Sequence, residues 1–454
     1  MKKIVFALIC FPFVSMAQSP DDAAYIKKIS DEILRNGKAY DLLHQLTKQI
    51  GGRLSGSPQF AKAVQWGKLA MEQNGAEKVF LQECMIPHWV RGGKDKAVII
   101  SIDKKPTSRS LDVLAIGNSL GKGTVSAPVL AVADFDELEK RKGEVKGKIV
   151  YYNQRFNPTN INPVVSYIET GIYRYSGASR AAKYGAVGVM ICSLTESTAN
   201  DPHTGMLEYN DSFPKIPAIA VGPRDADYVW EMSRKSNFSM SMSTYGHYLP
   251  DTIGHNVIAE LKGTQFPDQY ITIGGHLDSW DVNEGAIDDG TGVVHTIEIM
   301  RALQAIGYKP KHTLRFVLFA NEENGSRGSG KYATEAKAKG EKHVFALESD
   351  AGGFTPRGFS LNVSKEQLAK FQSWLPLLSP YGSFIFTQDG GGEDVNDLNT
   401  ALGTPVGELI PDPQRYFDLH HARSDVFEKV NKRELLLGAV NMAALIYLVD
   451  KYGL

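Results

Sequence analysis

The sequence has few cysteines, almost no net charge and few long apolar runs, and each shortage excludes a class of protein. Three cysteines in 454 residues are too few for a disulfide framework, and Cys84 and Cys192 either pair or stay as buried thiols. A formal charge of −1 offers no basic surface, so we expect no nucleic-acid partner. Beyond the first 20 residues we expect no membrane span. What is left is a globular chain long enough for two or three domains.

The first residues, MKKIVFALICFPFVSMAQSP, have the composition of a secretory leader. Two lysines precede an apolar run at residues 4–14, and a small-residue cleavage site ends at Ala17. We predict a signal peptide over residues 1–17 and a secreted or periplasmic mature protein. The isoleucine before Cys10 disfavours a lipid anchor at that cysteine.

Hydrophobic periodicity divides the remaining chain into three parts. Helical spacing dominates from residue 21 to about 75, and short strand-like runs follow. Residues 121–246 have short strands separated by turns and read as an inserted, β-rich domain. We therefore assign residues 18–120 and 247–454 to one domain that this insert interrupts.

The last part of the chain alternates strands and helices, which favours an α/β architecture. Its strands are almost wholly apolar, as expected for a sheet that is covered on both faces. We predict a three-layer α/β/α sandwich. The expected strands are 255–261, 270–274, 313–320 and 344–348, and the expected helices are 291–306 and 329–339.

Polar side chains follow these strands at the point where each one ends. In an open α/β sheet, ligands bind beyond the carboxyl ends of the strands, so we expect these side chains to form a site. They are His276 and Asp278 after one strand, Glu322 and Glu323 after the next, Asp350 after a third, and Asp288 in the glycine-rich stretch GAIDDGTG. Taken singly, the glutamate pair reads as a solvated helix start and the aspartate as a turn residue.

Gathered at one sheet edge, these acids would repel one another by several kcal/mol unless a cation lay between them. Imidazole and carboxylate ligands without thiolate suit zinc, and the number of carboxylates suits two ions. Two ions with one histidine each require a second histidine downstream. The stretch YFDLHHARSD supplies two candidates, His420 and His421.

Seven short motifs, in this order, resemble the co-catalytic zinc aminopeptidase and carboxypeptidase family over essentially the whole mature chain. They are GGRLSGSP, PHWVRG, GGHLDSWD, GAIDDGTG, FANEENGSRGS, ESDAGG and YFDLHHARSD. Within the insert, GASRAAKYGAVGVMICS resembles part of a protease-associated domain. The resemblance implies a zinc-exopeptidase sandwich that carries this insert, and it implies a homodimer.

The resemblance also implies a role for each residue of the site. His276 and Asp350 would hold one zinc ion, Glu323 and His421 the other, Asp288 would bridge them, Glu322 would be the general base, and Asp278 would accept a hydrogen bond from His276. His421 is preferred to His420 because the family's histidine precedes an acid by four positions, here Asp425.

The expected activity is hydrolysis of dipeptides or short peptides with a free N-terminus, by a water that the two ions share and Glu322 deprotonates. Three alternatives stay open. A broad aminopeptidase would accept longer peptides, a non-catalytic receptor would have lost ligands, and an aminoacyl cyclase would lack the base or the bridge. All five predicted ligands and the base are present in this sequence.

Overall fold

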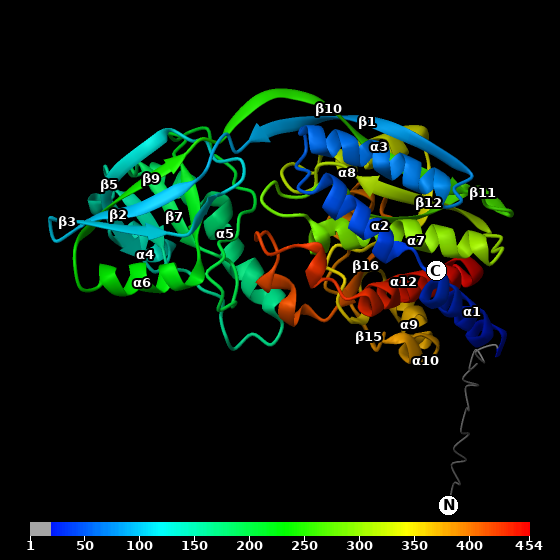
Figure 1. Ribbon diagram of the computed structural model, residues 1–454. Helices are drawn as coiled ribbons and strands as arrows, with labels where there is room; N and C mark the ends of the chain where they lie inside the picture. Colours follow the sequence, from blue (N-terminus) through cyan, green and yellow to red (C-terminus); the bar gives the residue numbers. More distant parts are fainter. Residues whose placement is uncertain (1–19) are drawn as a thin grey trace, which may run out of the picture.

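A computed structural model describes residues 20–454, so the predicted signal peptide lies outside the described part. The chain forms two lobes, each built on an eight-stranded sheet (Figure 1). Two long antiparallel strands join the lobes: β1 (Lys78–Val90) runs from the larger lobe towards the smaller one, and β10 (His247–Leu261) returns from it. The smaller lobe is thus an insertion between two halves of the larger.

The sheet of the larger lobe has the order β1-β10-β12-β11-β13-β16-β14-β15. Its remaining strands are β11 (Phe266–His276), β12 (His312–Phe319), β13 (Lys342–Glu348), β14 (Pro356–Asn362), β15 (Ile385–Thr387) and β16 (Val406–Pro411). β11 pairs in parallel with both β12 and β13. The carboxyl ends of these three strands therefore meet at one edge.

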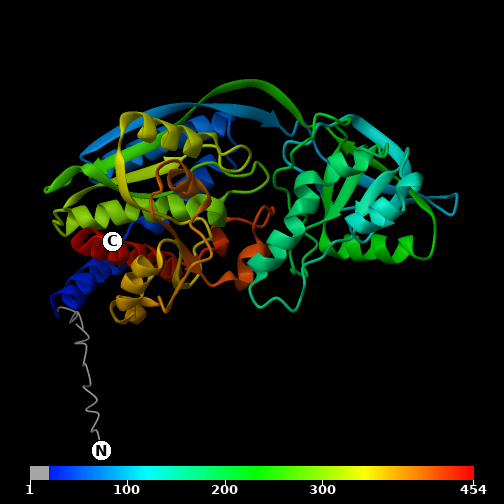
Figure 2. The ribbon, with the colours of Figure 1, turned by 180° about the vertical axis from the view of Figure 1, so that it is seen from behind.

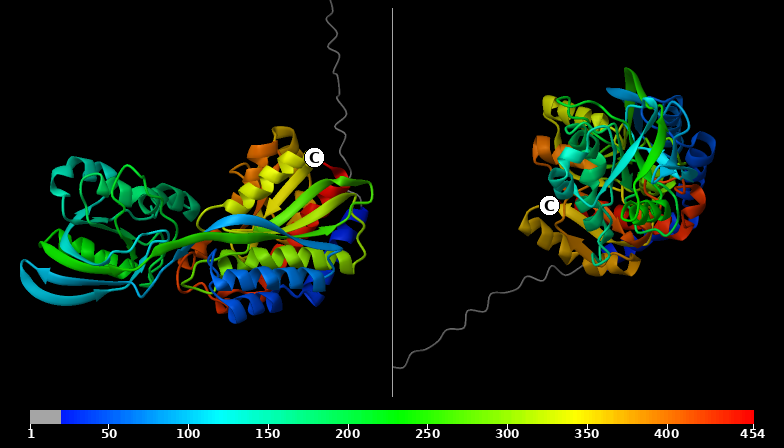
Figure 3. Two further views of the ribbon diagram at one scale, coloured as in Figure 1. Left: turned by 90° about the horizontal axis from the view of Figure 1, so that it is seen from above. Right: turned by 90° about the vertical axis from the view of Figure 1, so that its left-hand side faces the viewer.

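Helices cover both faces of this sheet, which confirms the predicted α/β/α sandwich (Figure 3). One face packs against α1 (Pro20–Asn36), α2 (Ala39–Gln45), α3 (Pro58–Gln73), α7 (Thr291–Ala305) and α12 (Lys432–Tyr452), with α9 (Lys365–Ser373) and α10 (Leu375–Leu378) at its β15 end. The other face packs against α8 (Arg327–Lys339) and α11 (Glu393–Leu402). Because both faces are covered, the central strand β12 is buried along its whole length and is mostly apolar.

Helix α12 corrects the expectation that no segment beyond the first 20 residues is long and apolar enough for a membrane span. It has 21 residues and a mean hydropathy of 1.4, so by length and composition it could cross a membrane. In the fold, 83% of its most apolar window is buried beneath the sheet and neighbouring helices. Its apolar character is therefore that of a core helix.

The insert is larger than predicted. Its sheet has the order β3-β2-β9-β5-β6-β7-β8-β4, and β2 pairs with β9 from the far end of the segment. The elements are β2 (Lys96–Ile102), β3 (Lys105–Leu111), β4 (Val113–Ala115), β5 (Gly123–Val132), β6 (Ile149–Tyr152), β7 (Gly188–Cys192), β8 (Ala218–Val221), β9 (Phe238–Thr244), α4 (Phe135–Lys140), α5 (Pro163–Ala182) and α6 (Pro223–Ser233). The predicted start at residue 121 is thus too late, because strands before it belong to this sheet.

The two cysteines of the described chain do not pair. Cys84 lies on β1 and Cys192 on β7, in different lobes, and both are buried free thiols. Burial raises the pKa of each thiol to about 11, which keeps both protonated and unreactive at neutral pH.

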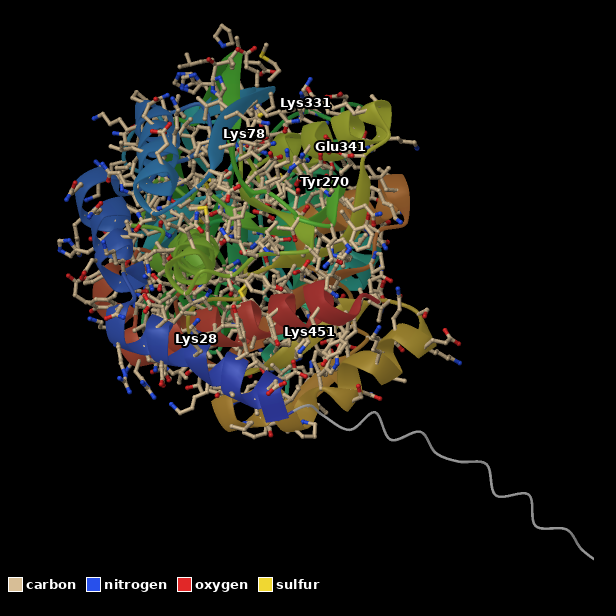
Figure 4. The ribbon with its side chains drawn as sticks, turned by 90° about the vertical axis from the view of Figure 1, so that its right-hand side faces the viewer. Lys28, Lys78, Tyr270, Lys331, Glu341 and Lys451 are labelled. Carbon is tan, nitrogen blue, oxygen red and sulfur yellow. The ribbon has the colours of Figure 1, made fainter. Side chains whose placement is uncertain are left out.

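Arg315, on β12, contacts Tyr270 and Glu341, which lie at the end of the large sheet that faces away from the insert (Figure 4). Its guanidinium lies 3.8 Å from the ring centre of Tyr270 and donates to Glu260 at 3.0 Å and to Glu341 at 2.7 Å. Tyr270 and Glu341 lie close together in this view. Because the arginine is nearly buried, it neutralises two carboxylates where solvent screens them weakly.

We expect Arg315→Met to lower the free energy of unfolding by about 3 kcal/mol, because two carboxylates lose their shared partner. Lys27→Met breaks an exposed ion pair with Asp31 and should change the free energy of unfolding by less than about 0.5 kcal/mol. Denaturant unfolding of both variants measures the difference. Equal effects would show that Arg315 contributes no more than a surface charge.

Candidate metal centre

Polar side chains meet at the carboxyl edge of three neighbouring parallel strands. His276 is the last residue of β11, Glu322 and Glu323 follow β12, and Asp350 follows β13. Asp288 approaches from the segment between β11 and α7. The structure therefore brings together the residues that the sequence selected from separate strands.

The side chains form two groups, each with one histidine and one carboxylate, and Asp288 lies between them. His276 Nε2 is 3.1 Å from Asp350 Oδ1 and 3.1 Å from Asp288 Oδ1. His421 Nε2 is 3.1 Å from Glu323 Oε2 and 3.2 Å from Asp288 Oδ2. The two oxygens of one carboxylate thus face opposite groups, which is the arrangement of a bridging ligand.

The electrostatics of this cluster fit divalent cations. Asp288 Oδ2 is buried and, although His421 Nε2 lies 3.2 Å away, it accepts no well-aligned hydrogen bond in the described chain. Burial, followed by the charge of Asp288, raises the pKa of Glu323 well above its usual range, and burial also raises the pKa of Asp350. Buried carboxylates that resist ionisation, gathered around two imidazoles, are ligands for a metal such as zinc, whose charge would reverse both carboxylate shifts.

His421 is better placed than His420 to join this cluster. His421 reaches two carboxylates, whereas His420 Nε2 approaches only Asp288 Oδ2, at 3.5 Å. The two imidazole rings stack with their centres 3.6 Å apart, and His420 also packs on Tyr416. The geometry therefore favours His421 as the ligand and gives His420 a packing role.

Glu322 lies beside the cluster without joining either group. It is half-buried, and its nearest imidazole nitrogen, His276 Nε2, is 4.0 Å away. Burial and then the charges of Asp350 and Glu323 raise the pKa of Glu322 well above its usual range. A carboxylate whose pKa is raised binds a proton more readily than a free one, which suits a general base that must accept and return a proton.

Asp278 corrects a predicted contact. We expected its carboxylate to accept a hydrogen bond from His276, but those atoms are 3.9 Å apart. His276 Nδ1 instead lies 3.0 Å from the backbone carbonyl oxygen of Asp278. The carboxylate accepts hydrogen bonds from Ser55 Oγ and from the backbone N–H of Glu322. Asp278 therefore orients the base segment with its side chain and the histidine with its backbone.

Two further acids, absent from the predicted site, support the ligand loops. Asp425 accepts the backbone N–H groups of residues 286–288, at 2.7 to 3.2 Å, and so holds the segment that carries the bridging carboxylate. Asp289 accepts the backbone N–H groups of His276 and Gly292. The sequence contained a signal for Asp425, because it is the acid four positions after His421.

Arg53 explains the motif GGRLSGSP. Its side chain is fully buried and donates to the backbone carbonyl oxygens of Leu277, Glu284 and Gly285. One arginine thus closes the loop that follows β11. The sequence offered the motif but no sign of what its arginine contacts, because the partners are backbone atoms more than 200 positions away.

A cavity of about 480 Å³ opens onto the cluster, and both lobes line it. Tyr416 and Phe417 form part of its wall, as does the glycine-rich loop at residues 390–391. Helix α5 of the insert reaches across to the segment around Tyr416 (Figure 2) and contributes Tyr167 and Arg174. Its size matches a small-molecule or short-peptide site.

The fold and the site together define a metal-dependent hydrolase with an α/β/α core. Comparison with known sequences narrows this class. A sequence profile of Peptidase family M28 matches residues 256–446. Carboxypeptidase Q of Mus musculus is 35% identical over 419 residues, which cover 91% of this chain and 85% of the mouse protein. The human carboxypeptidase Q has the same identity and coverage.

Comparison with solved structures supports the same family. The crystal structure of a Peptidase M28 precursor from Shewanella amazonensis SB2B has a TM-score of 0.89 and 31% identity, covering 95% of this chain and 97% of that one. A zinc aminopeptidase from Bacillus subtilis shares the fold, with a TM-score of 0.64, 18% identity and 90% and 93% coverage. The chain belongs to peptidase family M28 and is a metallopeptidase.

Replacing the bridging carboxylate should remove metal. We expect Asp288→Ala to weaken binding of divalent metal by at least ~100-fold, because both groups lose a ligand. Asp389→Ala, at an exposed acid that lines the same cavity, should leave it unchanged. Metal content after dialysis against defined free zinc tests this. Two zinc ions per chain in Asp288→Ala would place the bridge elsewhere.

The metal-free protein should lose stability as the pH rises. Burial raises the pKa of Asp425 to about 7 and of Glu348, two residues before Asp350, to about 8. Between about pH 4 and 8 the unfolded chain therefore releases protons that the folded chain retains, which favours unfolding. Metal should oppose this loss by stabilising the ionised carboxylates. Thermal unfolding with and without chelator should give curves that diverge with pH, and parallel curves would contradict this account.

Proposed function

We propose that this protein is a secreted di-zinc exopeptidase that hydrolyses dipeptides or short peptides with a free N-terminus. The observation that carries the proposal is the position of the Asp288 carboxylate between the two groups. One of its oxygens faces His276 and Asp350, and the other faces His421 and Glu323. One bridging carboxylate and two histidine–carboxylate pairs are the ligand set of a two-metal hydrolase.

Each protein group has a definite task in this reaction. Bound zinc ions would polarise the scissile carbonyl and acidify water at neutral pH. Glu322, which lies beside both groups without joining either, takes the proton from the attacking water and returns it to the leaving amine. The hydrogen bond from its backbone N–H to Asp278 fixes the position of the base.

The charge of the cavity supports a substrate with a free amine. Three acids besides the predicted ligands and base, Asp389, Glu393 and Glu408, line the cavity and offer oxygens that can accept hydrogen bonds from an ammonium group. An α-ammonium group would be attracted there, whereas a blocked N-terminus would bring no charge. The acids that line the cavity are Asp288, Glu322, Glu323, Asp350, Asp389, Glu393 and Glu408.

The insert supports short substrates over long ones. Helix α5 and the residues before it close one side of the cavity, and Gln414 donates to the carbonyl oxygen of Ile161 across the two lobes. A long peptide would meet this wall. We propose further that the insert is a protease-associated domain, that the leader at residues 1–17 directs secretion, and that the protein is a homodimer, as the family resemblance implies.

Glu322→Gln should retain its zinc while turnover falls by at least ~10², because the amide can no longer accept the proton from water. Gln keeps the size and the backbone contact of the base. The matched control is Glu335→Gln, on the outer side of α8, which should keep normal turnover. Near-normal rates in Glu322→Gln would mean that another group is the base.

The proposed function is tested by the zinc-loaded protein with three substrate sets: free dipeptides, their N-acetylated forms and longer peptides. We expect rapid hydrolysis of free dipeptides, slower hydrolysis of longer peptides and very slow hydrolysis of acetylated forms. Hydrolysis of acetylated peptides without any of free dipeptides would overturn the exopeptidase assignment. Fast hydrolysis of long peptides would favour the broad aminopeptidase.

A further inference from the structure

Two asparagines flank the acidic pair that includes the proposed base, and they connect this turn to the insert. Asn321 stands immediately before Glu322, and Asn324 stands immediately after Glu323. Asn321 Nδ2 donates to Asn324 Oδ1 at 2.6 Å, and Asn324 Nδ2 donates to Asn118 Oδ1 of the insert at 3.3 Å. All three amides are buried. A chain of side-chain amides therefore links the base turn, residues 321–324, to the smaller lobe.

The backbone sets the direction of each amide in this chain. The backbone N–H of Arg327, which can only donate, lies 3.3 Å from Asn321 Oδ1. The NH2 group of Asn321 must therefore point towards Asn324, whose oxygen accepts it. The NH2 group of Asn324 then points towards Asn118. What the turn requires of Asn118 is thus an accepting oxygen.

Asn118 is held in place by its own lobe. The backbone N–H of Gly117 donates to the carbonyl oxygen of Gly205 at 2.8 Å, and the N–H of Leu207 donates to the carbonyl oxygen of Gly117 at 3.1 Å. The insert also touches the larger lobe at this point, because a Cβ on Gly117 would lie 1.9 Å from the ring of Trp280. Asn118 therefore offers an acceptor whose position is fixed relative to both lobes.

The base turn has few other restraints of its own. It lies between β12 and α8, outside regular secondary structure. The backbone N–H of Glu322 donates to Asp278 Oδ1 at 3.1 Å, and the N–H of Gly325 lies 3.4 Å from the carbonyl oxygen of Glu322, which is a long hydrogen bond. The link to Asn118 is therefore a substantial part of what fixes the turn.

We propose that Asn118 is a positioning residue through which the insert holds the base turn and keeps the Glu322 carboxylate in place. This rests on the proposed function, in which Glu322 is the general base. A base must lie within hydrogen-bond reach of the proton that it accepts. A displacement of about 1 Å can lower a rate by up to ~100-fold, so a buried hydrogen bond away from the substrate can control turnover.

The first test is kinetic. Asn118→Gly removes the acceptor without straining the backbone, because Asn118 has a φ of 64°, which glycine adopts freely. We expect kcat on a free dipeptide to fall about 5- to 30-fold, with KM within about twofold and zinc content as in the wild type. Asn118→Asp keeps an accepting oxygen and should stay within about threefold of wild-type kcat. The matched control is Lys104→Gly, at the same φ of 64° in an exposed turn of the insert, which should have wild-type kcat.

Hydrogen exchange gives a readout that needs neither zinc nor turnover. In the zinc-free protein, the backbone amides of residues 321–328 should exchange at least ~10-fold faster in Asn118→Gly than in the wild type. Asn118→Asp and Lys104→Gly should exchange at the wild-type rate. Asn324→Ala should exchange at least as fast as Asn118→Gly, and Asn118→Gly/Asn324→Ala should be no faster than Asn324→Ala, because both changes break the same link.

A different role for Asn118 gives different results. Wild-type kcat or wild-type exchange in Asn118→Gly would overturn the proposal, and so would equal losses of kcat in Asn118→Asp and Asn118→Gly. Loss of zinc from Asn118→Gly would show that Asn118 supports the metal centre and would overturn it as well. If the wild type hydrolyses no peptide, or if Glu322→Gln keeps normal turnover, the proposed function fails instead. The exchange rates then decide by themselves whether Asn118 holds the turn.

Discussion

The constraint on which the rest of the structure depends is the mutual repulsion of buried carboxylates at one edge of the large sheet, which must be offset. Asp288, Glu323 and Asp350 are drawn within hydrogen-bond distance of two imidazoles, and Glu322 lies beside them. Several kcal/mol of repulsion between such groups would loosen the loops that carry them unless cations neutralised it. Bound divalent cations would therefore stabilise the folded site in this geometry, so the proposed chemistry and the fold share one requirement.

Much of the surrounding structure exists to hold the ligand loops against that repulsion. Arg53 and Asp425 are buried and bond mainly to backbone atoms of residues 277–288. The insert also holds His421, the last predicted ligand: the backbone N–H of Thr204 donates to the carbonyl oxygen of His421, and Arg423 pairs with Asp112. The insert thus supports the site and also forms a wall of the cavity, to which α5 contributes Arg174.

The sequence predicted what depends on local pattern. The apolar runs that became β12 and β13 were recognisable because both of their faces are buried, and Asp350 was identified because it follows such a run. The predictions that failed concern contacts between residues far apart in the sequence. The insert begins before residue 121 because β2 pairs with β9, more than 130 positions later. Asp278 does not orient His276 with its carboxylate, because that carboxylate accepts hydrogen bonds from Ser55 and Glu322, 223 and 44 positions away.

Anomalous diffraction at the zinc edge, from crystals grown with zinc, tests the central claim most directly. The account predicts two peaks roughly 3.5–4 Å apart, one between His276 and Asp350 and one between Glu323 and His421, with Asp288 touching both. The same side chains ordered as described, with water alone among them, would contradict it.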